Sequence, residues 1–317
     1  MTKLVSLILP CFNAANYIER YLTNLLQQKY SNIELIVVND GSTDNTEDVI
    51  FDFFKNKNCR NIQLKYFSQP NSGVASAFNN ALKYYTGDFL TWGDPDDFLS
   101  PLSISERVSF LNDNPEYGFV RTNANLISPD GHSVVGELTS SDSEYIFDDL
   151  IFENNMPVTV GNYLLRSECF KNSLPSQNIY SEARGQNWQL LLPIALKYKC
   201  GFINEKLNNI VLRDNSLSRS DTTLCSEIYR CDEHNKILHA VLKDLDVDFS
   251  YYDALLNQKY ISKKFELSVN YMDYDLAHQY FLQIENKTNV HYIKLLLVKL
   301  RIYGFLKLAY MKVFRPI

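Results

Sequence analysis

Four short, mainly apolar strand patterns in the first third of the chain limit its fold more than any other feature. They span residues 4–10, 33–38, 62–67 and 88–92. Helical patterns separate them, over about residues 14–28, from about residue 44 onward, and over about residues 74–85. Strands that alternate with helices form a parallel sheet with helices packed on its faces. The order therefore predicts an α/β fold built on a doubly wound sheet.

A polar segment follows each apolar run, at the end where the strand would leave the sheet. These segments are Cys11–Asn16, Asn39–Asp44, Ser68–Gly73 and Gly93–Asp97. In open α/β sheets, ligands bind in the crevice beyond the carboxyl ends of the strands. None of the four segments contains a G-x-G-x-x-G or P-loop sequence. A dinucleotide-dependent oxidoreductase or a phosphate-loop enzyme is therefore disfavoured, and we expect one crevice for another ligand.

The last of these segments carries three carboxylates within four positions, Asp94, Asp96 and Asp97. In an extended chain, side chains at i and i+2 point the same way. Pro95 disfavours helical geometry for Asp94, so we expect Asp94 and Asp96 to share one face while Asp97 points elsewhere. Two carboxylates on one side suit Mg²⁺ or Mn²⁺. The alternative is a solvated Asp-rich turn, and the position beside three other polar segments favours the metal site.

Four stretches together resemble a family 2 glycosyltransferase of the GT-A fold. They are VSLILPCFNAANYIERYLTNLLQQ, IELIVVNDGSTDNT, QPNSGVASAFNNAL and GDFLTWGDPDDFLSP. The resemblance is close over about residues 4–105 and looser to about residue 220. It implies a Rossmann-like doubly wound mixed sheet over residues 1–220. A smaller, mainly helical region follows over residues 221–317.

The resemblance also implies roles for individual residues. Asp94 and Asp96 would hold a divalent metal ion, Mn²⁺ or Mg²⁺, against the diphosphate of a nucleotide sugar. From the residues alone, Phe12 could equally be a core residue and Asp40 a turn residue ahead of Gly41. The cluster formed by Arg213, Ser218 and Arg219 could also be a solvated loop. The nucleotide-binding residues that the resemblance implies are Pro10, Phe12, Asn13, Asp40, Asn71, Gly73, Asp94, Arg213, Ser218 and Arg219.

The chain departs from the family pattern at two places. Phe78 stands where the family often has an arginine, which removes one contact to the base or phosphate. Gln186 and Asn187 stand where the family has an E-D pair whose Asp is the general base, and an amide cannot accept a proton at neutral pH. We therefore expect Glu182 or Asp97 to supply the catalytic base, with Gln186 and Asn187 orienting the acceptor.

These observations leave two functions open. The first is a metal-dependent glycosyltransferase that inverts the anomeric carbon. It would be a hexosyl- or N-acetylhexosaminyltransferase that uses a UDP-sugar and a glycan or lipid-linked acceptor in bacterial surface polysaccharide synthesis. The second is a catalytically impaired nucleotide-sugar-binding protein. A sugar nucleotidyltransferase is disfavoured, because no Gly-rich basic loop follows the first strand.

Composition and charge restrict the partners and the compartment. The net charge of −6 disfavours nucleic acid as a partner. The six cysteines show no C-x-x-C spacing, and the N-terminus does not read as a signal peptide, so we expect a cytoplasmic protein with reduced thiols. Residues 287–317 contain seven Lys or Arg and no Asp or Glu. This basic, Leu- and Tyr-rich segment predicts peripheral contact with the inner face of the membrane, with a core-packing or oligomerising helix as the alternative.

Overall fold

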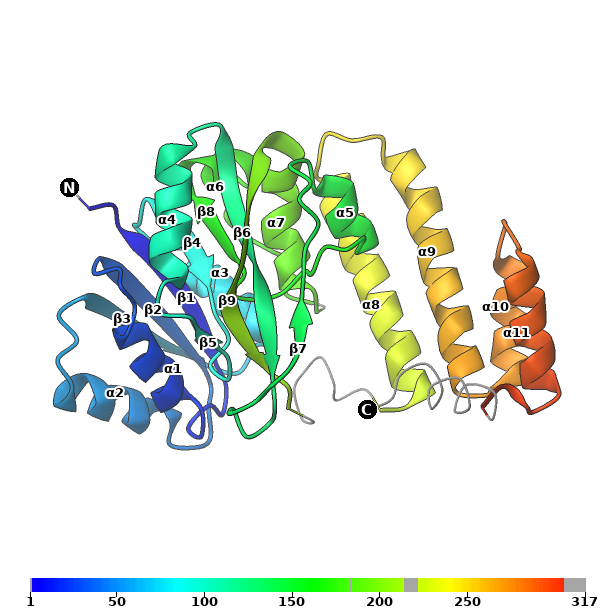
Figure 1. Cartoon of the computed structure of the whole chain (residues 1–317), viewed down its shortest axis with the longest axis horizontal. Coiled ribbons are helices and arrows are strands. Elements are labelled where there is room, and N and C mark those ends of the chain that lie inside the picture. Colours follow the sequence, from blue (N-terminus) through cyan, green and yellow to red (C-terminus); the bar gives the residue numbers. More distant parts are fainter. Residues whose placement is uncertain (1, 183, 214–221, 305–317) are drawn as a thin grey trace. The chain divides into compact units, whose positions relative to one another are not determined.

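The computed structural model describes residues 2–182, 184–213 and 222–304, and the chain divides into two compact units, residues 1–214 and 215–317 (Figure 1). Ser218 and Arg219 lie outside the described residues, as does the end of the basic segment, residues 305–317. The boundary predicted between residues 220 and 221 also lies there and stays a prediction.

Unit 1 is built on a nine-stranded mixed sheet. Its strands are β1 (Val5–Cys11), β2 (Ile33–Asp40), β3 (Ile62–Gln69), β4 (Phe89–Trp92), β5 (Phe98–Leu99), β6 (Tyr117–Ile127), β7 (Val134–Leu138), β8 (Tyr163–Arg166) and β9 (Lys199–Val211). The strand order is β3-β2-β1-β4-β8-β6-β9-β5, with β7 paired to β6. The four predicted strands are neighbours and run parallel, whereas β8 runs antiparallel to both β4 and β6. The predicted strands and their parallel arrangement are confirmed.

Helices cover both faces of this sheet (Figure 1). They are α1 (Ile18–Leu26), α2 (Thr46–Asn56), α3 (Val74–Ala81), α4 (Ser103–Asp113), α5 (Phe147–Phe152), α6 (Ser167–Ser173) and α7 (Gln186–Lys197). Alternate residues of β1, such as Leu7 and Leu9, join one core with the apolar faces of α1, α2 and α4. On the other face, Phe78 of α3 packs edge-on against Trp92. Every residue of β2 is buried, which explains the apolar sequence of residues 35–38 at its centre.

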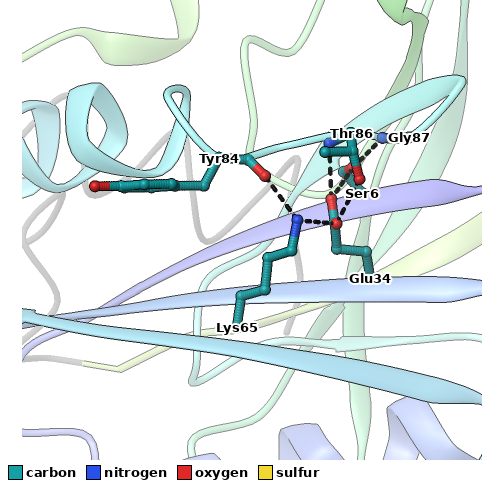
Figure 2. Close-up of polar contacts among 6 residues, drawn as sticks. All are labelled: Ser6, Glu34, Lys65, Tyr84, Thr86 and Gly87. Atoms are coloured by element: carbon teal, nitrogen blue, oxygen red, sulfur yellow. Dashed lines mark hydrogen bonds and ion pairs between the residues drawn. The ribbon is translucent and has the colours of Figure 1, made fainter.

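A buried carboxylate joins the strands near their amino ends (Figure 2). Glu34 is 1% exposed and accepts hydrogen bonds from Ser6 Oγ at 2.6 Å, Thr86 N at 2.9 Å and Thr86 Oγ1 at 2.7 Å. The Lys65 ammonium forms an ion pair with the same carboxylate and also donates to the Tyr84 carbonyl. This Glu34 network fixes the turn that leads into β4, and β4 carries the acidic cluster at its other end.

Unit 2 is helical and has a core of its own. Its helices are α8 (Leu224–Lys243), α9 (Phe249–Asn270), α10 (Tyr274–Gln283) and α11 (Asn289–Lys299). Phe265 of α9, Phe281 of α10 and Val298 of α11 meet in this core. The sequence prediction of a mainly helical C-terminal region is confirmed. Within residues 2–182, 184–213 and 222–304, no helix has the length and apolarity needed to cross a membrane.

Candidate functional site

The loops that follow β1 and β2 are fastened to each other. Asn13 has a positive φ of 49°, its backbone N–H donates to Ser42 Oγ at 3.0 Å, and its side-chain oxygen accepts from Thr43 N at 2.8 Å. Ala14 N donates to Thr46 Oγ1 at 2.8 Å. α1 begins at Ile18 rather than near residue 14, after a turn in which Tyr17 N and Ile18 N donate to the Ala14 carbonyl. These bonds hold the two loops together at the carboxyl edge of the sheet.

Two of the residues predicted to bind the nucleoside, Pro10 and Phe12, lie at the end of β1 and in the loop that follows it. Phe12 is half exposed at the tip of the loop, so it is not a core residue. Pro10 lies at the end of β1 and is only partly buried. An exposed ring beside fixed backbone groups is suited to stacking against a planar ligand such as a nucleobase.

Asp40, at the end of β2, holds the third loop. One carboxylate oxygen accepts from Ser72 N at 2.9 Å and Gln69 Nε2 at 2.8 Å, and the other accepts from Gly73 N at 2.8 Å. Gly41 has a φ of 70°, and a Cβ there would lie 2.6 Å from the backbone N of Asn71. The two loops therefore approach as closely as a glycine allows. In this structure, Asp40 positions the Asn71–Gly73 loop, while Asn71 and Gly73 themselves are exposed.

The acidic segment after β4 is a turn and not an extended strand. Asp97 N donates to the carbonyl of Asp94 at 3.1 Å, and Pro95 occupies the second turn position that proline favours. The predicted extended geometry is therefore wrong. The carboxyl groups of Asp94 and Asp96 nonetheless lie within hydrogen-bonding reach of each other, because the turn folds them together. Gly93 is required ahead of the turn, since a Cβ there would lie 2.0 Å from the hydroxyl of Tyr21.

The turn concentrates negative charge that nearby arginines only partly balance. Asp94 opens to solvent, yet desolvation by the surrounding protein and the carboxylates of Asp96 and Asp97 raise its pKa. Burial and the Asp96 carboxylate raise the pKa of Asp97 to about 8. Asp97 is 8% exposed, and its Oδ1 accepts from Val211 N at 2.9 Å, which ties the turn to β9. Arg213 forms an ion pair with Asp96.

The residues of this turn fit a divalent metal ion. Within the described part of the chain, no group of three or more His, Cys, Asp or Glu side chains could hold a metal by itself. Two adjacent carboxylates are present, however, and Mg²⁺ is commonly bound by one or two carboxylates together with substrate phosphates. The pKa of Asp94 is raised by desolvation first and then by the neighbouring carboxylates, and a bound cation would offset the repulsion between these carboxylates. Asp94 and Asp96 therefore suit an ion whose other ligands come from a diphosphate and water.

The two amides at the start of α7 lie in different surroundings. Asn187 Oδ1 accepts from the indole N–H of Trp92 at 2.9 Å, and Asn187 Nδ2 donates to the carbonyl of Val158 at 3.2 Å. The first bond joins α7 to the end of β4, and the second joins it to the loop between α5 and β8. Gln186 is the first residue of α7 and is partly exposed, while Glu182 is exposed in the preceding loop.

Two side chains that the sequence did not single out anchor this loop. Asn79 of α3 donates to the carbonyl of Ile179 at 2.7 Å and accepts from Ile179 N at 2.8 Å. Gln189 accepts from Tyr180 N at 2.6 Å. The partners are 100 residues apart in the first case, so no local pattern could have identified them.

The sequence of this chain is similar to those of known glycosyltransferases. Residues 6–172 match the family model for glycosyl transferase family 2. Chondroitin synthase of Pasteurella multocida is 28% identical over 289 residues, which cover 90% of this chain and 26% of that protein. Hyaluronan synthase of the same species is 38% identical over 129 residues, 40% of this chain and 13% of that protein. The chain thus spans about a quarter or less of these two synthases.

Solved structures share the fold at low sequence identity. Staphylococcus aureus TarS 1–349 in complex with UDP-GlcNAc gives a TM-score of 0.64 at 13% identity, covering 95% of this chain and 88% of that one. The mannosyltransferase PcManGT from Pyrobaculum calidifontis, in complex with GDP-Man and Mn²⁺, gives a TM-score of 0.62 at 14% identity, covering 98% and 87%. The GT-A fold predicted from the sequence is confirmed.

Proposed function

The chain belongs to glycosyl transferase family 2, and from this premise we propose that it transfers a sugar from a nucleotide-diphosphate donor to a saccharide acceptor with the help of a divalent metal ion. The observation that carries the proposal is the turn at the end of β4. It places Asp94 and Asp96 side by side, with an arginine against them. In doubly wound sheets, this carboxyl edge is where nucleotides bind.

Asp94 and Asp96 would hold the metal ion, Mn²⁺ or Mg²⁺. When bound, the ion would neutralise charge on the departing diphosphate. Arg213 would contribute a guanidinium for the phosphate oxygens, since such charge-assisted hydrogen bonds are among the strongest in proteins. Phe12 and the Asn71–Gly73 loop would enclose the nucleoside, with Asp40 holding that loop in place. Pro10, Asn13, Ser218 and Arg219 complete the proposed donor site.

Relatives and structural neighbours suggest the donor and the pathway. TarS was solved with UDP-GlcNAc, and the relatives include a chondroitin synthase and a hyaluronan synthase. We therefore propose a UDP-sugar donor that carries a hexose or an N-acetylhexosamine. The acceptor would be a glycan or a lipid-linked saccharide of bacterial surface polysaccharide synthesis.

Glu182 is the better of the two candidates for the general base. Asn187 cannot take a proton, and both of its polar groups bond within the protein. Asp97 is buried, and one of its oxygens accepts from Val211 N, so its main contribution would be to hold the turn. Glu182 is exposed in the loop ahead of α7, which gives it access to an acceptor hydroxyl. A general base contributes about 10²–10⁴-fold to the rate.

The bonding of Asn187 also supports the second candidate function. A protein that binds a nucleotide sugar without transferring it would need no base, and here the amide serves to join α7 to β4. The two functions differ in turnover and not in donor binding.

The deciding experiment incubates the full chain with Mn²⁺, a panel of UDP- and GDP-sugars and saccharide acceptors, and follows nucleotide release and product mass. We expect metal-dependent transfer that Asp96→Asn abolishes and that Asp52→Asn, at an exposed position of α2, leaves unchanged. Donor binding without transfer by the wild type would establish the binding-protein function. Undiminished transfer in excess chelator would refute the metal's role.

We also propose that unit 2 contacts an anionic membrane surface through α11. Tyr292, Ile293 and Leu296 are exposed on this helix, on the side away from buried Val298, and Leu300 is exposed directly after it. The surrounding segment, residues 287–317, carries seven basic and no acidic residues, which suits anionic lipid headgroups. This contact would hold a cytoplasmic enzyme against the inner face of the membrane, near a lipid-linked acceptor.

A further inference from the structure

The ion pair between Arg213 and Asp96 occupies a side chain that the proposed function assigns to the metal. Both Nε and Nη2 of Arg213 approach the same oxygen, Oδ2 of Asp96. The Asp96 side chain is 7% exposed and the Arg213 side chain 26% exposed, so water screens the pair only in part. A cation that binds Asp96 through this oxygen must displace the guanidinium.

Arg213 is held in this position by more than the carboxylate. Its guanidinium lies 4.2 Å from the ring centroid of Tyr17, in the loop between β1 and α1. Cation–π contact of this kind strengthens when the cation is partly desolvated. The pKa of Arg213 is raised, because its attraction to Asp96 and Tyr17 outweighs the opposing effect of burial. The arginine therefore stays charged and joins the acidic turn to the loop between β1 and α1.

The backbone side of Asp96 is fixed independently of Arg213. The Arg20 guanidinium donates to the main-chain carbonyl of Asp96 and lies over the Phe98 ring at 5.5 Å. Asp97 is bonded to Val211 N. Loss of the Arg213 ion pair would thus free the Asp96 carboxylate without releasing the turn.

We infer that Arg213 is an exchangeable counterion of Asp96 that couples metal binding to nucleotide binding. With neither ligand bound, Arg213 neutralises Asp96 and competes with the metal. When a nucleoside diphosphate arrives, its phosphate oxygens offer Arg213 another anion, and Asp96 becomes available to the metal. Each ligand therefore strengthens the binding of the other, and the metal alone binds weakly. This inference rests on the proposed function. It adds that Arg213 leaves Asp96 for the diphosphate as the metal ion takes its place on Asp96.

The inference predicts effects of opposite sign for one substitution. Arg213→Ala should bind Mn²⁺ alone more tightly, because the competitor of Asp96 is gone. It should bind UDP in the presence of Mn²⁺ less tightly, because a phosphate contact is lost. The factor by which UDP raises Mn²⁺ affinity should fall below the wild-type value, which we expect in the range of about 5–150 that coupled sites usually show, but it should stay above one, because the diphosphate still supplies ligands to the ion. Arg213→Lys keeps the positive charge but lacks the planar guanidinium. Its affinities for Mn²⁺ alone and for UDP with Mn²⁺ should lie between those of the wild type and of Arg213→Ala.

The experiment titrates Mn²⁺ into the full chain by electron paramagnetic resonance of the free ion, with and without UDP or GDP. Circular dichroism verifies the fold of each variant, and Arg60→Ala, at an exposed position, is the matched control that should reproduce the wild type. If Arg213→Ala and Arg213→Lys both leave the affinity for Mn²⁺ alone unchanged or weaken it, Arg213 does not compete with the metal and the inference is overturned. If the wild type binds neither nucleotide with Mn²⁺, the proposed function fails instead, whereas the Mn²⁺-only titrations still test the competition.

Discussion

Truncation of Glu34 tests whether the buried network at the amino ends of the strands stabilises unit 1. Glu34→Ala removes the acceptor of Ser6 Oγ, Thr86 N and Thr86 Oγ1, as well as the counterion of Lys65. Breaking a buried ion pair by removing one partner costs about 3–5 kcal/mol. The Lys65 side chain is 33% exposed and can rehydrate, so we expect the lower end, about 3 kcal/mol.

The pH dependence gives this prediction a second, independent readout. Burial alone would raise the pKa of Glu34, but the hydrogen bonds from Lys65, Ser6 and Thr86 lower it below its ordinary value. A lowered pKa in the folded state contributes stability above the ordinary value of about 4.3, and this stability is lost as the pH falls through the folded-state value. The difference between wild type and Glu34→Ala should therefore be complete at neutral pH and narrow below about pH 4.

Urea unfolding followed by tryptophan fluorescence measures the effect in unit 1 alone, because both tryptophans, Trp92 and Trp188, belong to it. With a slope of about 1–3 kcal/mol per molar urea, the midpoint should fall by at least about 1 M. Glu205→Ala, an exposed glutamate in β9, is the matched control and should change the free energy of unfolding by less than about 0.5 kcal/mol. A loss below about 1 kcal/mol for Glu34→Ala, or a difference that does not narrow as the pH is lowered below the ordinary pKa of a glutamate, would refute the reasoning.

Three further predictions concern the donor site and unit 2. Asp40→Ala should weaken UDP binding about tenfold without changing the metal requirement, because two backbone hydrogen bonds that order the Asn71–Gly73 loop are lost; equal calorimetric titrations of variant and wild type would contradict this. Asn187→Ala should lower the Tm by about 2–4 °C, since the amide accepts a hydrogen bond from the Trp92 indole, and should leave UDP affinity unchanged. A thermal scan measures the first effect and a UDP titration the second, and an unchanged Tm or a weakened UDP affinity would contradict the prediction. Leu296→Glu combined with Leu300→Glu should stop the full chain from sedimenting with anionic vesicles at low salt, whereas unchanged sedimentation would exclude α11 as the contact.

The sequence by itself determined the parallel half of the sheet and the location of the acidic cluster. A strand buried on both faces is mainly apolar, as over residues 35–38 of β2, so its pattern is visible in the chain without knowledge of its neighbours. A polar segment that follows such a strand lies at the carboxyl edge of the sheet wherever the strand is placed in the order. Both inferences depend only on residues that are close in sequence.

The shape of the acidic turn and the partner of each polar side chain were decided by the tertiary structure. Pro95 fixes its own φ near a value that suits both an extended strand and the second position of a turn, so the local sequence did not choose between them. Asp40 bonds to Gly73, 33 residues away, Trp92 to Asn187, 95 residues away, and Asp96 to Arg213, 117 residues away. Antiparallel pairing of β5 with β9 brings the last of these together, because it sets the end of β9 beside the acidic turn. A carboxylate accepts from any donor that the fold places within reach, and strand order, which is a property of the whole chain, decides which donor that is.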